Sequence, residues 1–451
     1  MSIRSNIAKI AGKSAQIILK NFFNRGSALP GKIALKIDPK ILDSLAGGYE
    51  IIVVTGTNGK TLTTALVTKV IESEFGQVVT NPTGSNMQQG IVGTFLSAPK
   101  VKKGERKFAV LEIDEASLPK VTEFIKPSLF VFTNIFRDQM DRYGEIYTTY
   151  RMIVEGAAKS PQATILANGD SPIFNSLETV NKRIYYGFDK DPEHIQSAEP
   201  NTDGVLCPKC HHVLKYKQLV YANLGEYFCE HCDFHRPELD YKLTEIQFQD
   251  NNASEFTAAG VHVKMGVGGM YNIYNALAAV AVGKYYDIEP AKIAKALEYD
   301  ERIFGRQETF EINGKTCTLV LVKNPVGLNQ VIDMIELAPY EFTLASILNA
   351  NYADGIDVSW IWDSHHEKFA NMNISKAIAA GDRHRDMALR LEVAGIAPEK
   401  LVEVENFDGL VKEITSAPTD EVYILATYTA MLGLRDYLAE HKFIKGGMIN
   451  E

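Results

Sequence analysis

The chain has 451 residues, of which 45% are hydrophobic and 23% charged, the composition of a globular protein with room for two or three domains. Its formal net charge of −9 argues against general nucleic-acid binding, which requires a basic surface. No apolar run is long enough to span a membrane, and no signal peptide is evident. Five cysteines, four of them in CxxC pairs, favour a reducing compartment and a bound metal over disulfides.

The first 37 residues are basic and contain no acidic residue. Their basic residues are Arg4, Lys9, Lys13, Lys20, Arg25, Lys32 and Lys36. The apolar side chains that fit one face of a helix are Ile3, Ile7, Ile10 and Ile18. Such a helix either lies on an anionic lipid surface or packs on the protein with its basic face in solvent. We favour the second interpretation and expect residues 1–48 to form an N-terminal helical segment.

The next segments alternate between strand-like and helical patterns. Tyr49–Thr55 is a β-branched apolar run that ends in a glycine-rich turn and precedes a helical pattern over about residues 62–74. Further buried-type strand patterns lie at residues 107–113, 128–134 and 163–168. Strands that alternate with helices predict an α/β fold with a parallel sheet.

The alternation is interrupted at about residues 203–237, which hold the CxxC pairs. It then continues with short strand-like runs and a helix over about residues 271–286, and it restarts near residue 310 with the strand-like residues 316–322. We therefore expect a central domain over residues 49–310 that carries an insertion, and a C-terminal Rossmann-like α/β domain over residues 311–451.

The turn after the first strand, GTNGKT at residues 56–61, has the features of a phosphate loop. Its glycines allow backbone N–H groups to approach phosphate oxygens. Lys60 is placed to reach the β- and γ-phosphates, and the Thr61 hydroxyl to face Mg²⁺. The match to the general P-loop pattern is partial, because Val54 stands where that pattern has glycine. A simple strand-to-helix turn remains an alternative on these six residues alone.

Together with other motifs, this loop resembles the ATP loop of the Mur ligase family, whose members join amino acids or glutamate chains to a substrate carboxylate. The other matches, in chain order, are NPTGSN at residues 81–86, Glu112, RDQMDRYG at residues 137–144, YNIYNALAA at residues 271–279 and FGRQE at residues 304–308. The resemblance implies a central P-loop ATPase domain that binds ATP and Mg²⁺. It assigns nucleotide binding to Gly56, Thr57, Asn58, Gly59, Lys60, Thr61, Asn275 and Arg306, and Mg²⁺ binding to Thr61 and Glu112.

Three departures from the family pattern limit the metal site. The central motif has Gln139 where the family usually has a histidine ligand, and Val154 lies where many members carry a carbamylated lysine. The segment VKNPVG at residues 322–327 lacks the aspartate that often precedes a C-terminal ATP contact. We therefore expect one Mg²⁺ held by Glu112, which ends a predicted strand, where such sheets bind ligands. Glu112 or Asp114 alone is also compatible with a solvated acid at a strand end.

The cysteine pairs CPKC and CEHC have the spacing of a structural zinc site, because 18 residues separate them. The expected ligands are Cys207, Cys210, Cys229 and Cys232. Four thiolates close the tetrahedron of the metal and leave no open position, so the site is predicted to be structural rather than catalytic. Competing ligands are His211, His212 and His231, and a redox pair is the alternative interpretation.

The fifth cysteine, Cys317, lies in a predicted strand core and is expected to be buried and inert. Hydrolysis of glutamine to ammonia requires a reactive cysteine and a histidine. The chain offers no persuasive pair of this kind. If its amine donor is ammonia from glutamine, the glutaminase must therefore be another chain.

Residues 351–363, NYADGIDVSWIWD, and residues 381–391, GDRHRDMALRL, closely resemble the MurT-like branch of the Mur ligases. That resemblance implies a partner, a GatD-like glutaminase subunit, and amidation of the D-glutamate α-carboxyl of lipid II to D-isoglutamine. It also implies that a C-terminal carboxylate, best matched by Asp357, completes the catalytic Cys–His pair of the partner.

The other residues of this stretch have structural interpretations. Asp354 is expected to shape a turn, and Asp363 to cap the following segment. Trp360 and Trp362 alternate as on a strand, which predicts one core side chain and one interface anchor. The adjacent histidines 365 and 366 are expected at the surface.

The sequence thus predicts a cytoplasmic ligase subunit that uses ATP, Mg²⁺ and structural Zn²⁺, with peripheral membrane contact through a lipid-linked substrate and no nucleic-acid partner. The alternative enzyme is an amino-acid-adding Mur ligase or a folylpolyglutamate synthase. A regulatory ATP-binding protein without catalysis is the alternative from another class.

Overall fold

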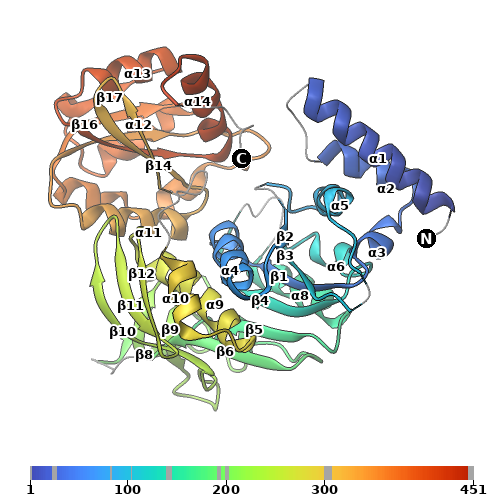
Figure 1. Ribbon diagram of the computed structural model, residues 1–451. Coiled ribbons are helices and arrows are strands. Elements are labelled where there is room, and N and C mark those ends of the chain that lie inside the picture. Colours follow the sequence, from blue (N-terminus) through green and yellow to red (C-terminus); the bar gives the residue numbers. More distant parts are fainter. Residues whose placement is uncertain are drawn as a thin grey trace.

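The computed structural model describes residues 3–22, 28–81, 84–102, 104–138, 145–189, 194–198, 203–298 and 307–444. Two α/β units lie side by side, and the N-terminal helices extend from the edge of the first unit (Figure 1). The expected α/β fold with a cysteine-bearing insertion is confirmed. Within the described parts of the chain, no helix combines the length and apolarity needed to cross a membrane.

The first unit is built on a nine-stranded sheet with the order β12-β11-β10-β6-β5-β4-β1-β3-β2. Its strands are β1 (Tyr49–Thr55), β2 (Val79–Thr80), β3 (Lys107–Glu112), β4 (Pro127–Phe132), β5 (Thr164–Asn168), β6 (Arg183–Phe188), β10 (Tyr241–Gln249), β11 (Ser254–Ala258) and β12 (Val261–Met265). The strands from β2 to β10 run parallel, and β10, β11 and β12 pair antiparallel. Because β1 lies between β3 and β4, the loop after β1 opens at the switch point of the strand order.

Helices cover both faces of this sheet, which is why its inner strands are almost continuously apolar. The helices are α1 (Ile3–Phe22), α2 (Ala28–Ile37), α3 (Ile41–Ala46), α4 (Lys60–Phe75), α5 (Gln88–Ser97), α6 (Leu118–Val121), α8 (Ile146–Ala158), η1 (Pro172–Asn175), α9 (Met270–Tyr285) and α10 (Pro290–Leu297). One core lies under α4, α9 and α10, and the other under α3, α5, α6 and α8.

The insertion forms a small antiparallel sheet of β7 (Gln196–Ser197), β8 (Lys215–Tyr221) and β9 (Leu224–Phe228) between β6 and β10. Its own small core contains Leu214, Tyr216, Tyr227 and Phe234 together with Cys207 and Cys229. A core of this size is weak by itself, so a metal or neighbouring domains must help to hold it.

The C-terminal unit has a six-stranded sheet with the order β13-β14-β18-β15-β16-β17. Its elements are β13 (Glu308–Ile312), β14 (Lys315–Leu321), α11 (Pro325–Glu336), β15 (Phe342–Ile347), η2 (Ser359–Asp363), η3 (His366–Asn371), β16 (Ile374–Ala380), α12 (His384–Val393), η4 (Pro398–Lys400), β17 (Leu401–Glu403), α13 (Phe407–Thr415), β18 (Glu421–Ala426) and α14 (Tyr428–Glu440). All strand pairs except β13 with β14 are parallel.

The N-terminal helix α1 differs from its expected packing. It lies on the body of the protein through small residues, since Ser5, Ala8 and Gly12 are buried, whereas Ile7 and Ile10 are exposed. A Cβ on Gly12 would lie 2.6 Å from Leu96 Cδ1, so the close approach of α1 to α5 depends on that glycine. The apolar face of α1 is therefore not what attaches it.

Candidate active site

The loop between β1 and α4, the predicted phosphate loop, is a tight turn that depends on its glycines. Gly56 and Gly59 have φ values of 133° and 82°, which favour glycine. A Cβ on Gly56 would lie 2.4 Å from Thr133 Oγ1, and one on Gly59 would lie 2.1 Å from Asn275 Oδ1. The loop is held by Asn134, whose backbone oxygen accepts from Thr57 N at 2.8 Å and whose side-chain oxygen accepts from Asn58 N at 2.8 Å. The loop thus presents a rigid backbone at the N-terminus of α4.

Lys60 is buried at the start of α4, with 9% of its surface exposed. Its Nζ donates to both carboxylate oxygens of Glu115 at 3.2 Å. Burial alone would lower the pKa of Lys60, but the carboxylates around it, Glu115 above all and then Asp114, raise the pKa above its ordinary value. Lys60 is therefore a charged group at the phosphate loop.

Glu115 is a residue that the sequence analysis did not single out. It lies three residues beyond Glu112 in the same acid-rich segment after β3, and only the folded chain brings it to Lys60. The signal in the sequence was the run of acids after a buried strand, but the run itself does not indicate which acid meets the lysine.

Glu112, the expected Mg²⁺ ligand, lies at the carboxyl end of β3 and is 6% exposed. Asn86 Nδ2 donates to Glu112 Oε1 at 3.0 Å, and the side chain of Asn81 bonds both backbone groups of Glu112. The two asparagines at the ends of the NPTGSN segment therefore lie against this acid. Thr61 lies half-buried in the first turn of α4.

Asn275, an expected nucleotide contact, lies on α9 and reaches the predicted phosphate loop. Thr63 Oγ1 donates to Asn275 Oδ1 at 3.2 Å. The same asparagine lines a mostly apolar pocket to which α4, α9, the insertion and the C-terminal unit contribute. The side chains around this pocket include Leu62, Tyr221, Tyr271, Val320 and Gln330. Tyr221 was not foreseen, since it belongs to strand β8 of the insertion.

Several residues of the family motifs lie outside the described residues, among them Arg306, the expected ATP contact, and Gln139 of the central motif. Their neighbours are placed. Gln307 Nε2 donates to the backbone oxygen of Asn251 at 3.1 Å, which holds this end of the segment against the central unit.

The four cysteines of the insertion converge. The sulfur atoms of Cys207, Cys210, Cys229 and Cys232 all lie within 4.8 Å of one another. The Sγ–Sγ distances are 3.5 Å for Cys207 and Cys232, and 3.4 Å for Cys210 and Cys229, too long for disulfides. Four sulfurs about 2.3 Å from a zinc ion lie about 3.8 Å apart, so the cluster has nearly the size of a tetrahedral metal site.

This cysteine cluster is the only group of three or more metal-ligating His, Cys, Asp or Glu residues in the part of the chain that the structure describes. His212 and His231, named above as competing ligands, stack their rings on each other with centroids 3.7 Å apart. The four thiols are thus the set that fits a metal.

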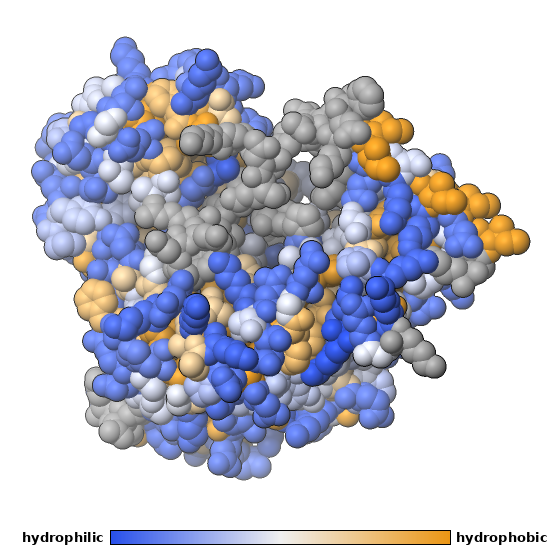
Figure 2. Space-filling view, viewed as in Figure 1, coloured by the Kyte–Doolittle hydropathy of each residue, from blue (hydrophilic) through white to orange (hydrophobic). Residues whose placement is uncertain are grey.

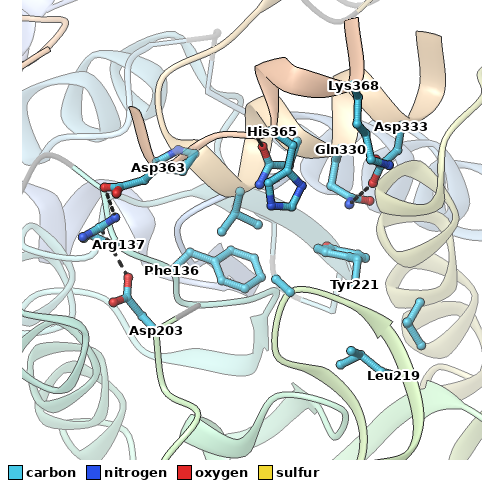
Figure 3. Close-up of a pocket in the computed structure, with 15 residues that line it drawn as sticks. Phe136, Arg137, Asp203, Leu219, Tyr221, Gln330, Asp333, Asp363, His365 and Lys368 are labelled. Carbon is cyan, nitrogen blue, oxygen red and sulfur yellow. Dashed lines mark hydrogen bonds and ion pairs between the residues drawn. The ribbon is translucent and has the colours of Figure 1, made fainter. Parts of the chain in front are cut away.

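A second cavity, of about 210 Å³, lies between the insertion and the C-terminal unit (Figure 3). Arg137, from the RDQMDRYG segment, forms ion pairs at its edge with Asp363 of the C-terminal unit and with Asp203 of the insertion, the latter at 3.5 Å. His365 and Lys368 line it from the C-terminal side. Arg137 therefore connects three parts of the molecule.

The aspartates of the stretch at residues 351–363 have three different environments. Asp354 is 4% exposed and accepts hydrogen bonds from Thr429 N at 2.7 Å and from Asn351 N at 3.0 Å, so it ties its turn to the start of α14. Asp357 is exposed and accepts from Ser359 N at 2.8 Å. Asp363 pairs with Arg137 instead of capping the following segment, which corrects that expectation.

Asp357 lies at the surface, beside residues of both α/β units. Hydrogen bonds from Ser359, and then the charge of Arg137, lower the pKa of Asp357 below its ordinary value, so it is ionised. A cavity of about 120 Å³ is lined by Asp357 together with Asp138 and Lys323, which form an ion pair. Next to Lys323, Asn324 Nδ2 donates to Asn58 Oδ1 of the loop at 3.0 Å.

Two expectations for this stretch were wrong. The tryptophans do not alternate on a strand, because residues 359–363 form the 3-10 helix η2; Ile361 is its buried residue, Trp360 packs beside the core, and Trp362 is 46% exposed. His366 is not at the surface, since it is 1% exposed and its Nδ1 lies 2.9 Å from Ser364 Oγ. Burial lowers the pKa of His366 to about 3.

Comparison with known proteins agrees with this arrangement. Residues 54–283 match the Mur ligase middle domain, and residues 321–431 match the MurT ligase C-terminal domain. The fold is similar to that of a pseudomurein peptide ligase type C from Methanothermus fervidus, with a TM-score of 0.65 at 19% identity over 89% of this chain and 81% of that one. The fold and the phosphate loop thus define a ligase of the Mur type.

Two relatives are subunits named MurT of a glutamine-hydrolysing lipid II isoglutaminyl synthase. The protein of Streptococcus pneumoniae is 51% identical over 99% of this chain and its whole own length, and that of Staphylococcus aureus strain COL is 33% identical over 90% of this chain and 91% of its own. The chain therefore belongs to the MurT family of lipid II isoglutaminyl synthase subunits, as the sequence motifs predicted.

Proposed function

We propose that this chain is the synthetase subunit that amidates the α-carboxyl of the D-glutamate in lipid II to D-isoglutamine, with ATP and with ammonia from a GatD-like glutaminase. The observation that carries the proposal is the full-length similarity to the S. pneumoniae relative, whose name states a glutamine-hydrolysing synthase that acts on lipid II. The site supports it with a buried cationic lysine in a phosphate loop.

The proposed reaction has two steps. A carboxylate oxygen of the substrate attacks the γ-phosphorus of ATP, which gives an acyl phosphate and ADP. Ammonia then attacks the acyl carbon, phosphate leaves, and the nitrogen loses a proton to form the carboxamide. The protein must neutralise the phosphate charge and align both attacks. We assign the first task to the backbone of residues 56–59 and to Lys60, because both lie at the N-terminus of α4.

We assign the nucleotide to the pocket beside the phosphate loop. Asn275 faces the loop from α9, and Tyr221 and Tyr271 supply aromatic surface for a base. Thr61 and Glu112 would hold Mg²⁺, which supplies positive charge to the phosphates when bound. Arg306 as a further ATP contact stays a prediction, because it lies outside the described residues.

The chain's own cysteines favour a separate glutaminase. Four of the five form the cluster in the insertion, and burial raises the pKa of the fifth, Cys317, to about 12. A thiol of that pKa is a poor nucleophile at neutral pH. We assign Asp357 to the partner's active site, as the carboxylate that orients a histidine, since it is exposed and ionised.

We assign structural Zn²⁺ to the cysteine cluster, because the sulfur separations fit the edge of a tetrahedron and no thiol is left over for substrate. We also place the protein in the cytoplasm at the inner face of the membrane. A lipid-linked substrate in the inner leaflet is accessible there.

The test is a reconstituted reaction with ATP, Mg²⁺ and lipid II, in which the product mass is read. With ammonium alone, we expect a loss of about one mass unit, because OH is replaced by NH₂. Addition of a whole amino-acid residue would instead identify an amino-acid-adding ligase, and no turnover with any amine would identify a non-catalytic ATP-binding protein. Lys60→Ala should remove the activity, whereas Lys292→Ala, at an exposed ion pair with Glu74, is the matched lysine control.

A further inference from the structure

The first helix exposes an apolar stripe, which Ser14 interrupts between Ile10 and Ile17. The exposed fractions are 82% for Ile3, 54% for Ile7, 67% for Ile10, 61% for Ile17 and 52% for Ile18. At about 100° per residue these five side chains fall on one side of the helix, opposite the buried Ser5, Ala8 and Gly12. Hydrophobic atoms accordingly gather along the outer side of α1 (Figure 2).

The helix that carries the stripe is firmly packed on the protein through its opposite side. Ser5 Oγ donates to Asp38 Oδ2 at 2.6 Å, and Gly12 lets α1 approach α5 closely. Helix α2 is held as tightly, because a Cβ on Gly31 would lie 1.8 Å from the backbone oxygen of Gln89. Close packing of α1 and α2 on the rest of the protein therefore holds the apolar stripe toward solvent.

Positive charge borders the stripe. Lys9 and Lys13 lie on one flank of α1, and Lys32 and Lys36 are exposed on α2. Residues 3–37 contain no acid, although the whole chain has a net charge of −9. Burial and then repulsion from Lys13 and Lys100 lower the pKa of Lys9, which indicates how closely the cations are gathered.

We propose that this face, consisting of the isoleucines of α1 and the lysines of α1 and α2, docks on the surface of an anionic phospholipid bilayer, with α1 lying in the plane of the interface. Exposed branched apolar side chains flanked by cations are the pattern of helices that bind such surfaces. A second copy of this chain is disfavoured as the occupant, because its lysines would face like charges. The proposal does not rest on the proposed activity.

Vesicle flotation of the full-length protein tests this docking. We expect it to float with vesicles of phosphatidylglycerol and phosphatidylcholine, and to float much less with phosphatidylcholine alone or at high salt. Ile7→Ser with Ile10→Ser should weaken binding to the anionic vesicles by at least about tenfold. Lys9→Gln with Lys13→Gln should weaken it severalfold and reduce its dependence on salt.

The matched control is Leu389→Ser with Val393→Ser, which removes two side chains of α12 that are 52% and 57% exposed. The control should bind vesicles as the wild type does. All variants should keep a melting temperature close to that of the wild type, since most of the substituted side chains are exposed and Lys9 is only partly buried. Failure of the wild type to float, or equal binding of the isoleucine variant, would overturn the proposal. So would a wild-type dimer in light scattering that the isoleucine variant dissociates, because the stripe would then be covered by a second copy.

Discussion

At the scale of single residues, position in the fold separates side chains that look alike in the sequence. Asp354, Asp357 and Asp363 lie in one acid-rich stretch, yet the first anchors a turn, the second is exposed, and the third pairs with Arg137. Likewise, His365 lines a cavity while its neighbour His366 is buried. Substitutions of these residues are therefore expected to have different effects.

Asp357→Asn should lower glutamine-dependent amidation by the complex at least about a hundredfold, because an amide does not stabilise a histidine cation as a carboxylate does. Amidation with added ammonium should remain close to the wild-type rate. The comparison is Asp354→Asn, which weakens buried hydrogen bonds and should cost about 1–3 kcal/mol of folding stability. Equal loss of both amidation activities in Asp357→Asn would contradict its assignment to the partner's site.

His366 should make folding stability depend on pH below neutrality. Its pKa is about 3 in the folded chain, below the ordinary value of 6.5, so the unfolded chain binds more protons between these two values. Its contribution is therefore fully present above about pH 6.5 and falls by about 1.4 kcal/mol per pH unit as the pH decreases toward 3. Urea denaturation at several pH values measures this change in the free energy of unfolding.

The comparison for this pH dependence is His366→Asn, which keeps a donor near Ser364 but does not titrate in this range. The difference in stability between wild type and variant should shrink steadily as the pH falls. If the stability of wild type and variant changed in parallel with pH over this range, the pKa of His366 would be the same in the folded and unfolded chains, and the prediction would be wrong.

At the scale of elements, the insertion between β6 and β10 has two roles. Its cysteines draw two turns of the chain together, and its strand β8 carries Tyr221 to the pocket beside the phosphate loop. Because its core is small, the placement of Tyr221 should depend on the metal site.

Purified protein should contain about one zinc per chain by plasma mass spectrometry. Cys229→Ser should lose most of that metal and weaken ATP binding about tenfold, because Tyr221 is no longer held. Cys317→Ala is the matched control and should keep the metal, since Cys317 lies in the other unit. Metal-free wild-type protein with unchanged ATP affinity would contradict the structural role.

At the scale of the whole molecule, polar contacts connect the two α/β units at two separate places. Asn58 pairs with Asn324 at the phosphate loop. Asn251 donates to the hydroxyl groups of Tyr340 and Tyr423 at 2.7 and 2.8 Å. The pocket itself is lined from both units. A nucleotide bound there should therefore stabilise both of them.

Hydrogen exchange tests this coupling. A non-hydrolysable ATP analogue with Mg²⁺ should slow amide exchange in α4 of the first unit and also in β14 and α11 of the second. At about 100 times its Kd, a ligand adds about 2.7 kcal/mol to stability. Lys60→Ala should show little protection in either unit. Protection limited to α4 in the wild type would mean that the C-terminal unit does not share the site.

Much of this protein could be predicted from the sequence alone, because the signals concerned are local. Continuous apolar strands between helical patterns indicated a parallel α/β fold, and glycines before Lys60 indicated the phosphate loop. The spacing of the CxxC pairs was sufficient for the cysteine cluster, since each turn places its own two thiols.

Only the tertiary structure decided the contacts between distant segments. The pairing of Lys60 with Glu115, the arrival of Tyr221 at the pocket and the burial of His366 all depend on how sheets and insertions pack, which no local pattern encodes. The isoleucines of α1 show the same limit, because a periodic apolar face indicates a surface to be covered but not what covers it. In the folded chain small residues attach that helix, so its apolar stripe faces outward.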